Sequence, residues 1–358
     1  MTSRIIVSAV LLVACGFLVH ESLACDGTCV AISCDATKKS SKKETPLVDL
    51  RFGENECNQI FEVCCPNSSY NVINKPVNKP EKVSKLTCGK RNANGIGFRI
   101  TESTLAESQY GELPWTLMIL SKEVLFDEPK YVSVGTASLI KPGVALTAAH
   151  VMSKTNGAEL VVRAGEWDSN KENEMFPVQE AIVSNIISHE QYNANSQFEN
   201  NIALLVLNQP FELLENVQLI CLPPPNFSYG QGNCVTGGWG KIHFGDTSQI
   251  NIMKRVQLPI VDRYQCQDAL RTTRLGPAFA LDESYICAGG HDGVDACTGD
   301  GGAALACPDA SGRVYHQVGI VAWGVGCGLK NIPAAYTNVA MFSGWIEEKL
   351  RNVPEYLL

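Results

Sequence analysis

Fifteen cysteines run through this chain of 358 residues, and they restrict its fold more strongly than any other feature. Residues 1–24 are typical of a secretory signal, because Arg4 precedes an apolar stretch and small residues end at Ala24. Cleavage after Ala24 removes Cys15 and leaves an even number of cysteines. An even number of cysteines in a secreted chain predicts a disulfide framework rather than a metal site. A retained signal anchor is the alternative for this segment.

The remaining cysteines form two groups, which indicates a small domain followed by a large one. Six lie between residues 25 and 65, a stretch too short to fold stably without covalent support. This first group is Cys25, Cys29, Cys34, Cys57, Cys64 and Cys65. The second group is Cys88, Cys221, Cys234, Cys266, Cys287, Cys297, Cys307 and Cys327. Residues 66–87 are rich in Asn, Pro, Lys and Ser without apolar periodicity, so we expect an exposed linker there.

The composition, with 45% hydrophobic and 18% charged residues, is that of a folded soluble protein. A formal net charge of −8 does not indicate the strongly basic surface that binds nucleic acid. Short β-rich runs over residues 131–140, 160–164 and 202–207 alternate with Gly and Pro turns, which predicts antiparallel strands. Apolar residues at helical spacing predict a terminal helix over 340–350. No apolar run after residue 24 is long enough for a transmembrane anchor.

Six short segments in the second part resemble, in the same order, the motifs of trypsin/chymotrypsin-like serine proteases. They are Leu146-Thr147-Ala148-Ala149-His150, Asn200-Asn201-Ile202-Ala203-Leu204-Leu205, Gly238-Trp239-Gly240, Asp295-Ala296-Cys297-Thr298-Gly299-Asp300-Gly301-Gly302, Ala322-Trp323-Gly324 and Pro333-Ala334-Ala335-Tyr336-Thr337. The resemblance extends from about Glu112 to Leu350. It implies an all-β fold with a double antiparallel β-barrel and a C-terminal helix.

The family's catalytic triad is degenerate in this chain. His150 stands at the position of the general base, but Asn201 replaces the Asp that orients it and Gly301 replaces the nucleophilic Ser. Glycine offers no oxygen for acyl transfer. An Asn at the second position costs about 10⁴-fold in rate because it selects the wrong tautomer of the imidazole. We therefore expect a pseudo-protease in which His150 is a packed loop residue; a residual hydrolase is the alternative.

The resemblance also implies remnants of a substrate pocket. Asp295 stands where trypsin-like enzymes place the acid at the base of the specificity pocket, and Trp323 and Gly324 stand along its wall. Ala334 replaces the Gly that keeps this pocket open, so an added methyl group narrows it. The oxyanion donor Gly299 is kept. The alternative for Asp295 is a purely structural role.

The resemblance implies four disulfides in the second group of cysteines. They are Cys88–Cys221, Cys234–Cys307, Cys266–Cys287 and Cys297–Cys327. The first of these matches the bridge that ties a pro-segment to the protease body. A further family bridge beside the histidine is absent, because Gly135 and Val151 stand at its two positions.

The first group of cysteines ends in the adjacent pair Cys64-Cys65 and resembles the clip domain of arthropod proteases. Spacing alone does not determine the pairing of six cysteines. The resemblance implies Cys25–Cys64, Cys29–Cys57 and Cys34–Cys65. The expected organisation is therefore a signal peptide (1–24), a clip domain (25–65), a linker (66–87) and a peptidase S1-like domain (88–358).

Exposed basic residues in mobile segments are candidates for trypsin-like cleavage. Lys43 and Arg51 lie inside the clip domain, and Arg99 precedes Ile100 at the place where zymogens of the family are cut. The family implies that a cut at Arg99 frees an amine that pairs with Asp300. Residues 100–103 depart from the usual activation terminus, so the sequence favours a cut inside the clip domain.

Four further residues are candidates for modification or metal binding. Asn67 and Asn226 begin sequons and predict glycosylation. Glu166 and Glu174 align with the acidic ligands of the family's calcium loop, and oxygen donors suit Ca²⁺. A solvated acidic turn is the alternative for this loop, and no cofactor is otherwise required.

The whole mature chain resembles the clip-domain serine protease homologues of insects, with their prophenoloxidase-activating-factor-2-like and masquerade-like members. The resemblance implies a secreted haemolymph protein that acts as a non-catalytic cofactor or regulator in prophenoloxidase activation, melanisation and innate immunity. The implied partners are an active clip-domain protease upstream and prophenoloxidase or another cascade protein, with homo-oligomers after cleavage. The alternative function is recognition or adhesion at microbial or cell surfaces.

Overall fold

The structure is a computed structural model of the chain. It describes the backbone of two short strands near the N-terminus and most of the chain from residue 87 onward. The described ranges are 28–31, 62–65, 87–97, 107–125, 128–155, 157–171, 174–194, 198–228, 233–243 and 250–358. The predicted signal peptide (1–24) lies outside them, and so does the predicted linker (66–87) except for its last residue.

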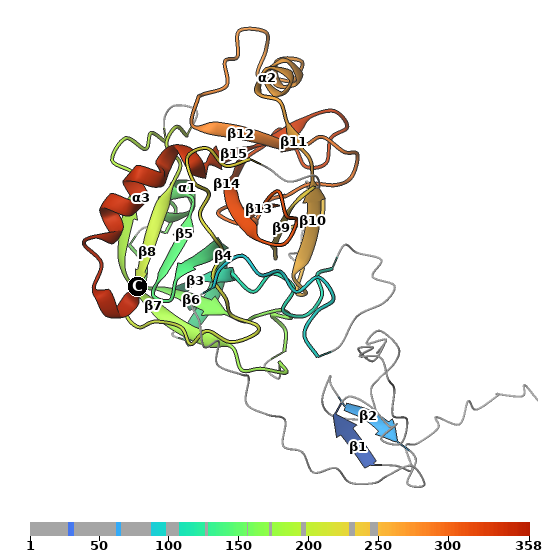
Figure 1. Ribbon diagram of the computed structural model, residues 1–358, viewed down its shortest axis with the longest axis vertical. Helices are drawn as coiled ribbons and strands as arrows, with labels where there is room; N and C mark the ends of the chain where they lie inside the picture. The colour runs from blue at the N-terminus through green and yellow to red at the C-terminus, as the bar shows by residue number, and fades with distance from the viewer. Residues whose placement is uncertain are drawn as a thin grey trace, which may run out of the picture.

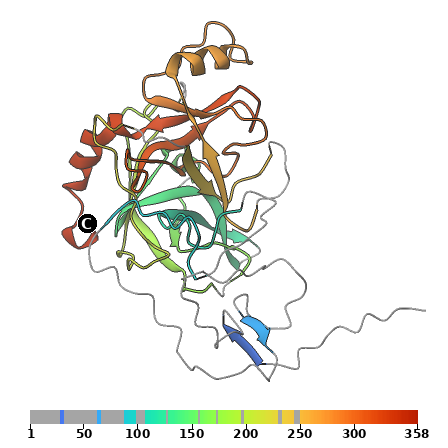
Figure 2. The same ribbon diagram turned by 45° about the vertical axis from the view of Figure 1, so that its right-hand side comes forward.

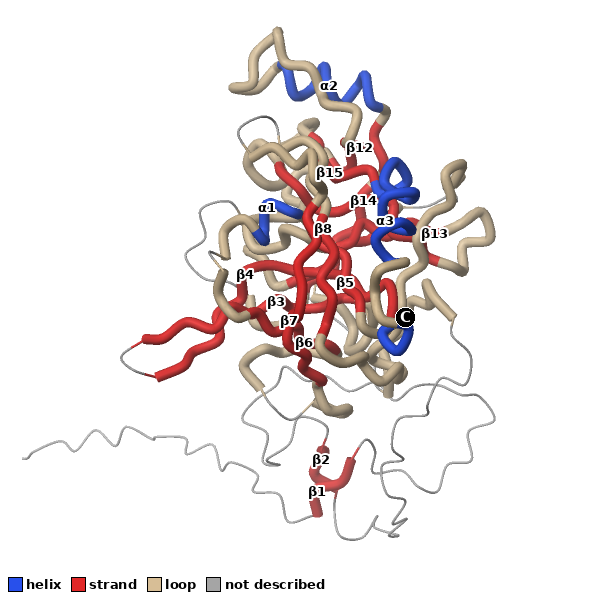
Figure 3. The backbone as a smooth tube through the Cα atoms, turned by 90° about the vertical axis from the view of Figure 1, so that its left-hand side faces the viewer, coloured by secondary structure: helices blue, strands red, loops and turns tan. Residues whose placement is uncertain are grey.

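Six antiparallel strands close into a barrel in the order β3-β4-β5-β8-β7-β6 (Figure 1). They are β3 (Thr116–Leu125), β4 (Glu128–Lys141), β5 (Val144–Thr147), β6 (Leu160–Ala164), β7 (Gln179–Ser188) and β8 (Ala203–Leu207). Strands β5 and β8 are buried along their whole length, which matches their near-continuous apolar sequences. Strands β3 and β4 continue beyond the barrel as a two-stranded ribbon (Figure 3).

A second antiparallel sheet of seven strands packs beside this barrel, in the order β10-β9-β13-β14-β15-β12-β11. Its strands are β9 (Cys234–Gly238), β10 (Lys254–Leu258), β11 (Ile260–Val261), β12 (Tyr285–Gly289), β13 (Ala304–Pro308), β14 (Tyr315–Trp323) and β15 (Pro333–Asn338). The buried core residues of the barrel contact those of β9 and β13. The predicted all-β fold with two antiparallel β-barrel-like halves is confirmed.

Helices are few and short in the described part. They are α1 (Ala149–Met152), α2 (Arg263–Arg271), η2 (Val339–Phe342), α3 (Ser343–Leu350) and η3 (Glu355–Leu357). The predicted terminal helix is present, but its first turn is the 3₁₀ helix η2. Phe342 and Ile346 are buried against the barrel beside which α3 runs (Figure 1). No helix in the described ranges is long and apolar enough to cross a membrane.

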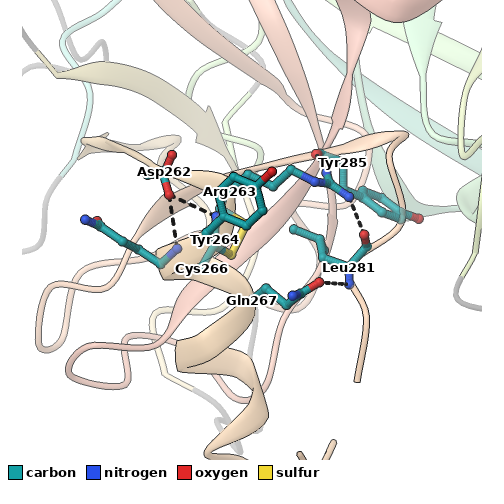
Figure 4. The surroundings of a disulfide bond; sticks show 9 residues. Asp262, Arg263, Tyr264, Cys266, Gln267, Leu281 and Tyr285 are labelled. Carbon is teal, nitrogen blue, oxygen red and sulfur yellow. Dashed lines mark hydrogen bonds between the residues drawn. A yellow bond between two sulfur atoms is a disulfide. The ribbon is translucent and has the colours of Figure 1, made fainter. Parts of the chain in front are cut away.

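Helix α2 projects from the second sheet, and the sequence motifs did not predict it (Figure 2). Asp262 caps its N-terminus by accepting hydrogen bonds from the amides of Tyr264 (2.9 Å) and Gln265 (3.2 Å). Figure 4 shows how the helix is fastened: the Arg263 guanidinium donates to the Leu281 carbonyl, next to the disulfide of Cys266. The Asp cap before a run of helix-forming residues was the signal available in the sequence.

Four disulfides lie in the described part and join the same pairs that the resemblance implies. They are Cys88–Cys221, Cys234–Cys307, Cys266–Cys287 and Cys297–Cys327. The two strands of the first cysteine group, β1 (Thr28–Ala31) and β2 (Glu62–Cys65), pair antiparallel. The expected clip disulfides Cys25–Cys64, Cys29–Cys57 and Cys34–Cys65 rest on side chains outside the described residues.

Candidate functional site

The fold brings together the three positions of the degenerate triad at the junction of its two halves. His150 lies on α1, directly after β5, and Asn201 lies just before β8 of the same barrel. Gly301 lies before β13 of the second sheet. The junction is held closely: the Thr136 amide donates to the Gly301 carbonyl at 2.9 Å. Gly302 has a φ of 88°, and an added Cβ there would lie 2.1 Å from the Thr136 carbonyl oxygen, so only glycine fits.

The buried side chain of Asn201 selects the tautomer of His150. Its Oδ1 accepts the backbone amide of His150 at 2.9 Å, which turns its Nδ2 toward the imidazole. Nδ2 lies 2.9 Å from the His150 Nδ1, whereas Oδ1 lies 3.3 Å from it. Since Nδ2 can only donate, Nδ1 is the acceptor and the neutral ring carries its proton on Nε2. A ring protonated on Nε2 cannot take a proton from a nucleophile placed at residue 301.

The imidazole of His150 is neutral over the physiological range. Burial and, to a smaller extent, the nearby charge of Lys154 lower its pKa to about 4, against the opposing effect of the hydrogen bond to Asn201. Because the pKa is lower in the folded state, the unfolded chain binds more protons between about pH 6.5 and 4. The contribution of His150 to stability is therefore present at neutral pH and is lost as the pH falls through this window.

Replacing Asn201 with Asp is expected to raise the pKa of His150. A carboxylate at Nδ1 stabilises the imidazolium form, whereas the amide donor does not. Nitrogen-15 NMR of labelled protein should show Nε2–H and a midpoint near 4 in the wild-type chain. In Asn201→Asp the midpoint should rise by more than one unit. A wild-type ring protonated on Nδ1 would contradict the tautomer assignment.

The imidazole also occupies space that a nucleophile would need. A Cβ added at Gly301 would lie 2.9 Å from the Nε2 of His150 and 3.3 Å from a methyl group of Val151. Contacts this short between a Cβ and its surroundings require one of them to move. A side chain at position 301 therefore requires His150 to shift.

Val151 likewise fills the place of the missing bridge beside the histidine. A Cβ added at Gly135 would lie 2.6 Å from a methyl group of Val151. The absent Cβ of Gly135 and the branched side chain of Val151 therefore complement each other in volume. Packing replaces the covalent link at this point, since Val151 is buried in the barrel core.

A cavity of about 210 Å³ opens beside this site. Its wall includes Trp323, Gly324 and Ala334, as the resemblance implied, together with the backbone of Gly299 and Gly301. Asp295 is not among the lining residues. Its Oδ2 instead accepts the Gly328 amide at 3.1 Å, and burial raises its pKa to about 6. The cavity therefore has no carboxylate from Asp295 in its wall.

Asp300 already has a cationic partner in the uncut chain. The ammonium of Lys254, on β10, lies 2.5 Å from its Oδ2, and both side chains are almost fully buried. The Asp300 carboxylate also accepts the amides of Gly240 (2.9 Å) and Cys297 (2.8 Å). The expected partner, the amine freed at Ile100, therefore meets an occupied carboxylate. Sequence reasoning missed Lys254, because a lysine in a strand normally points to solvent.

In the described part of the acidic loop, both predicted calcium ligands already have protein partners. Glu166 is paired with Arg163, whose Nη1 lies 3.0 Å from its Oε2. Glu174 accepts the amides of Trp167 (3.2 Å) and Asp168 (2.9 Å), and burial raises its pKa to about 7. Within the described ranges no group of three side chains suited to a metal ion is found. Calcium binding at Glu166 and Glu174 stays a prediction.

Of the predicted glycosylation and cleavage sites, the structure describes one. Asn226 is exposed in a turn, where a glycan has access. Lys43, Arg51, Asn67 and Arg99 lie outside the described residues.

Comparison with known proteins identifies the family. The model of the family described as Trypsin matches residues 104–346. Phenoloxidase-activating factor 2 of Galleria mellonella is 44% identical over 284 residues, which cover 77% of this chain and 92% of that protein. The chain is a clip-domain serine protease homologue of the trypsin family. Inactive CLIP domain-containing serine protease A8 of Anopheles gambiae is 37% identical over 322 residues, 88% of this chain and 85% of that protein.

A third relative, Inactive CLIP domain-containing serine protease A28 of Anopheles gambiae, is 36% identical over 367 residues. That alignment covers 97% of this clip-domain serine protease homologue and 95% of the relative, so the likeness includes the N-terminal part. Two of these three relatives are named inactive. Non-catalytic status in this homologue agrees with a site that has Gly301 against His150 and no hydroxyl between them.

Proposed function

We propose that this clip-domain serine protease homologue is a secreted, non-catalytic cofactor or regulator of the proteolytic cascade that activates prophenoloxidase. The observation that carries the proposal is a protease-like cleft, held in place in the uncut chain, whose nucleophile position is a glycine packed against His150. A cleft of this kind can bind a protein chain but cannot cut it. The name of the Galleria mellonella relative supports the choice of cascade.

The proposed organisation is a signal peptide (1–24), a clip domain (25–65), a linker (66–87) and the pseudo-protease domain (88–358). Its partners are an active clip-domain protease and prophenoloxidase or another cascade protein. Cleavage regulates it without releasing the clip domain. After a cut at Lys43 or Arg51 the expected clip disulfides tie the two pieces together, and after a cut at Arg99 the Cys88–Cys221 disulfide holds the clip segment on the barrel. Lys254 already neutralises Asp300, so a cut at Arg99 is not needed to order the cleft. This favours regulation by a cut inside the clip domain, at Lys43 or Arg51.

Reconstitution tests the proposed function. Purified prophenoloxidase and its activating clip protease should be mixed with and without this protein, and phenoloxidase activity measured. A cofactor raises the activity severalfold, and an inhibitory regulator lowers it; either result supports a cascade role. An unchanged activity, with both whole and cleaved protein, would reject the role. Binding to microbial cells in the same preparation would then favour recognition of surfaces.

A matched gel experiment follows the cut in the same mixture. Reduced samples should show two fragments, whereas non-reduced samples should keep the mass of the intact chain. The expected clip disulfides tie the pieces of a cut inside the clip domain, and Cys88–Cys221 ties those of a cut at Arg99. A Lys43→Gln, Arg51→Gln double variant and an Arg99→Gln variant distinguish the two cleavage regions. Loss of the cofactor effect only in the double variant agrees with the clip-internal cut.

A further inference from the structure

The cleft beside His150 presents several hydrogen-bond donors and no acceptor from the lost triad. Both Gly299 and Gly301 line the cavity, and within the described residues neither of their amides donates a hydrogen bond. In active relatives two such amides hold the oxygen of a reacting carbonyl for the lifetime of one chemical step. Here no covalent step follows, so these amides are free to bind an anion permanently.

His150 adds a third donor to the same point. Its Nδ1 faces the Asn201 amide, so its proton lies on Nε2, and a Cβ at Gly301 would be only 2.9 Å from this nitrogen. In a protease, Nε2 accepts the proton of the serine; in this chain it donates into the space that the serine has left. With its proton on Nε2, the imidazole cannot take a proton from a hydroxyl at this point, and it favours an oxygen that only accepts.

The charges around the cavity also favour a negatively charged ligand. Lys154 follows α1, is exposed at the rim and lines the same cavity, and the cavity lining contains no carboxylate. Asp295, the acid expected there, does not line the cavity and accepts the Gly328 amide instead. Hydrogen bonds to an ionised acceptor are about twice as strong as those between neutral groups. A carboxylate is therefore held more firmly here than the neutral carbonyl of an uncut chain.

We propose that this cleft is a binding site for the free C-terminal carboxylate of a protein chain whose last side chain is small and apolar. The carboxylate lies between the amides of Gly299 and Gly301 and the Nε2–H of His150, a form of backbone capture known for chain termini. The last side chain enters the cavity of about 210 Å³, whose apolar wall includes Val321, Trp323 and Ala334. The proposal goes beyond the cofactor role and does not rest on it.

Titration calorimetry with two synthetic peptides at pH 7 tests the proposal. The first is acetyl-Ala-Ala-Leu with a free carboxylate, and the second is the same peptide ending in a carboxamide. We expect the carboxylate to bind at least tenfold more tightly, with a preference that weakens in high salt. Equal affinity, tighter binding of the carboxamide, or no binding of either peptide at millimolar concentration would each overturn it.

Two variants assign the preference to this cleft. His150→Phe keeps an aromatic ring but removes the Nε2–H, and should reduce the difference between the peptides to less than threefold. Lys154→Ala alters only an exposed side chain and should weaken binding of the carboxylate alone, which keeps the test decisive if His150→Phe does not fold. Lys130→Ala, on the exposed ribbon, is the matched control and should bind as the wild type does. A peptide ending in Arg that binds more tightly than the Leu peptide would reject the apolar pocket.

Discussion

Replacing Lys254 with Met is expected to destabilise the uncut protein by about 3–5 kcal/mol, which is the usual cost of leaving one charge of a buried pair unpaired. The Lys254 ammonium lies 2.5 Å from Asp300, and solvent reaches only 4% and 2% of their side chains. Methionine fills much of the same volume but offers no charge. Chemical denaturation followed by fluorescence should show the loss as a lower midpoint with an unchanged slope.

Two controls separate the ion pair from general damage to the core. Lys130→Met, at an exposed lysine, should change stability by less than about 0.5 kcal/mol. Combining Lys254→Met with Asp300→Asn removes both charges, and the double variant should recover part of the lost stability. If the double variant is as unstable as the sum of the two single variants, the pair is not coupled and its ordering role is wrong.

Cleavage at Arg99 tests directly whether Asp300 needs a cationic partner. In Lys254→Met the amine freed at Ile100 can supply the missing cation to Asp300, so the cut should raise the midpoint of the variant. In the wild-type protein Lys254 already holds this place, so the same cut should leave the midpoint unchanged. If cleavage stabilises the wild-type protein, the new amino terminus must replace Lys254 as the partner of Asp300.

The sequence predicted the parts of this molecule that depend on local motifs. The segments around His150, Asn201 and Gly301 each have a recognisable local pattern, and their order determines where the two halves of the fold meet. The four cysteine pairs of the large domain were implied by the resemblance to the protease family.

The features that escaped prediction depend on contacts between distant segments. Lys254 is ordinary in its strand, and only the approach of the nucleophile loop makes it a buried partner of Asp300. The alignment of Glu166 with a calcium ligand did not anticipate Arg163, which takes that carboxylate. In both cases the sequence shows a charged side chain. The residue that pairs with it comes from a distant segment or a packed neighbour, and only the folded structure reveals that partner.

Restoring serine at position 301 is expected not to restore a protease. In Gly301→Ser the new Cβ lies 2.9 Å from His150 Nε2, so the ring must move before the side chain fits. Asn201 then still keeps the proton on Nε2, which alone costs about 10⁴-fold. Hydrolysis of Arg and Lys peptide substrates should therefore stay at least about 10⁴-fold below that of an active relative, measured as kcat/KM.

The double variant Asn201→Asp, Gly301→Ser is the informative comparison, because it supplies both the nucleophile and the group that reverses the tautomer. We expect it to react with a fluorophosphonate serine reagent faster than the single variant, while peptide cleavage remains slow until Ala334→Gly opens the pocket. This order follows from the two separate obstacles, the direction of one hydrogen bond and the width of one cavity. Efficient cleavage by Gly301→Ser alone would show that neither obstacle exists and that the glycine is the sole cause of inactivity.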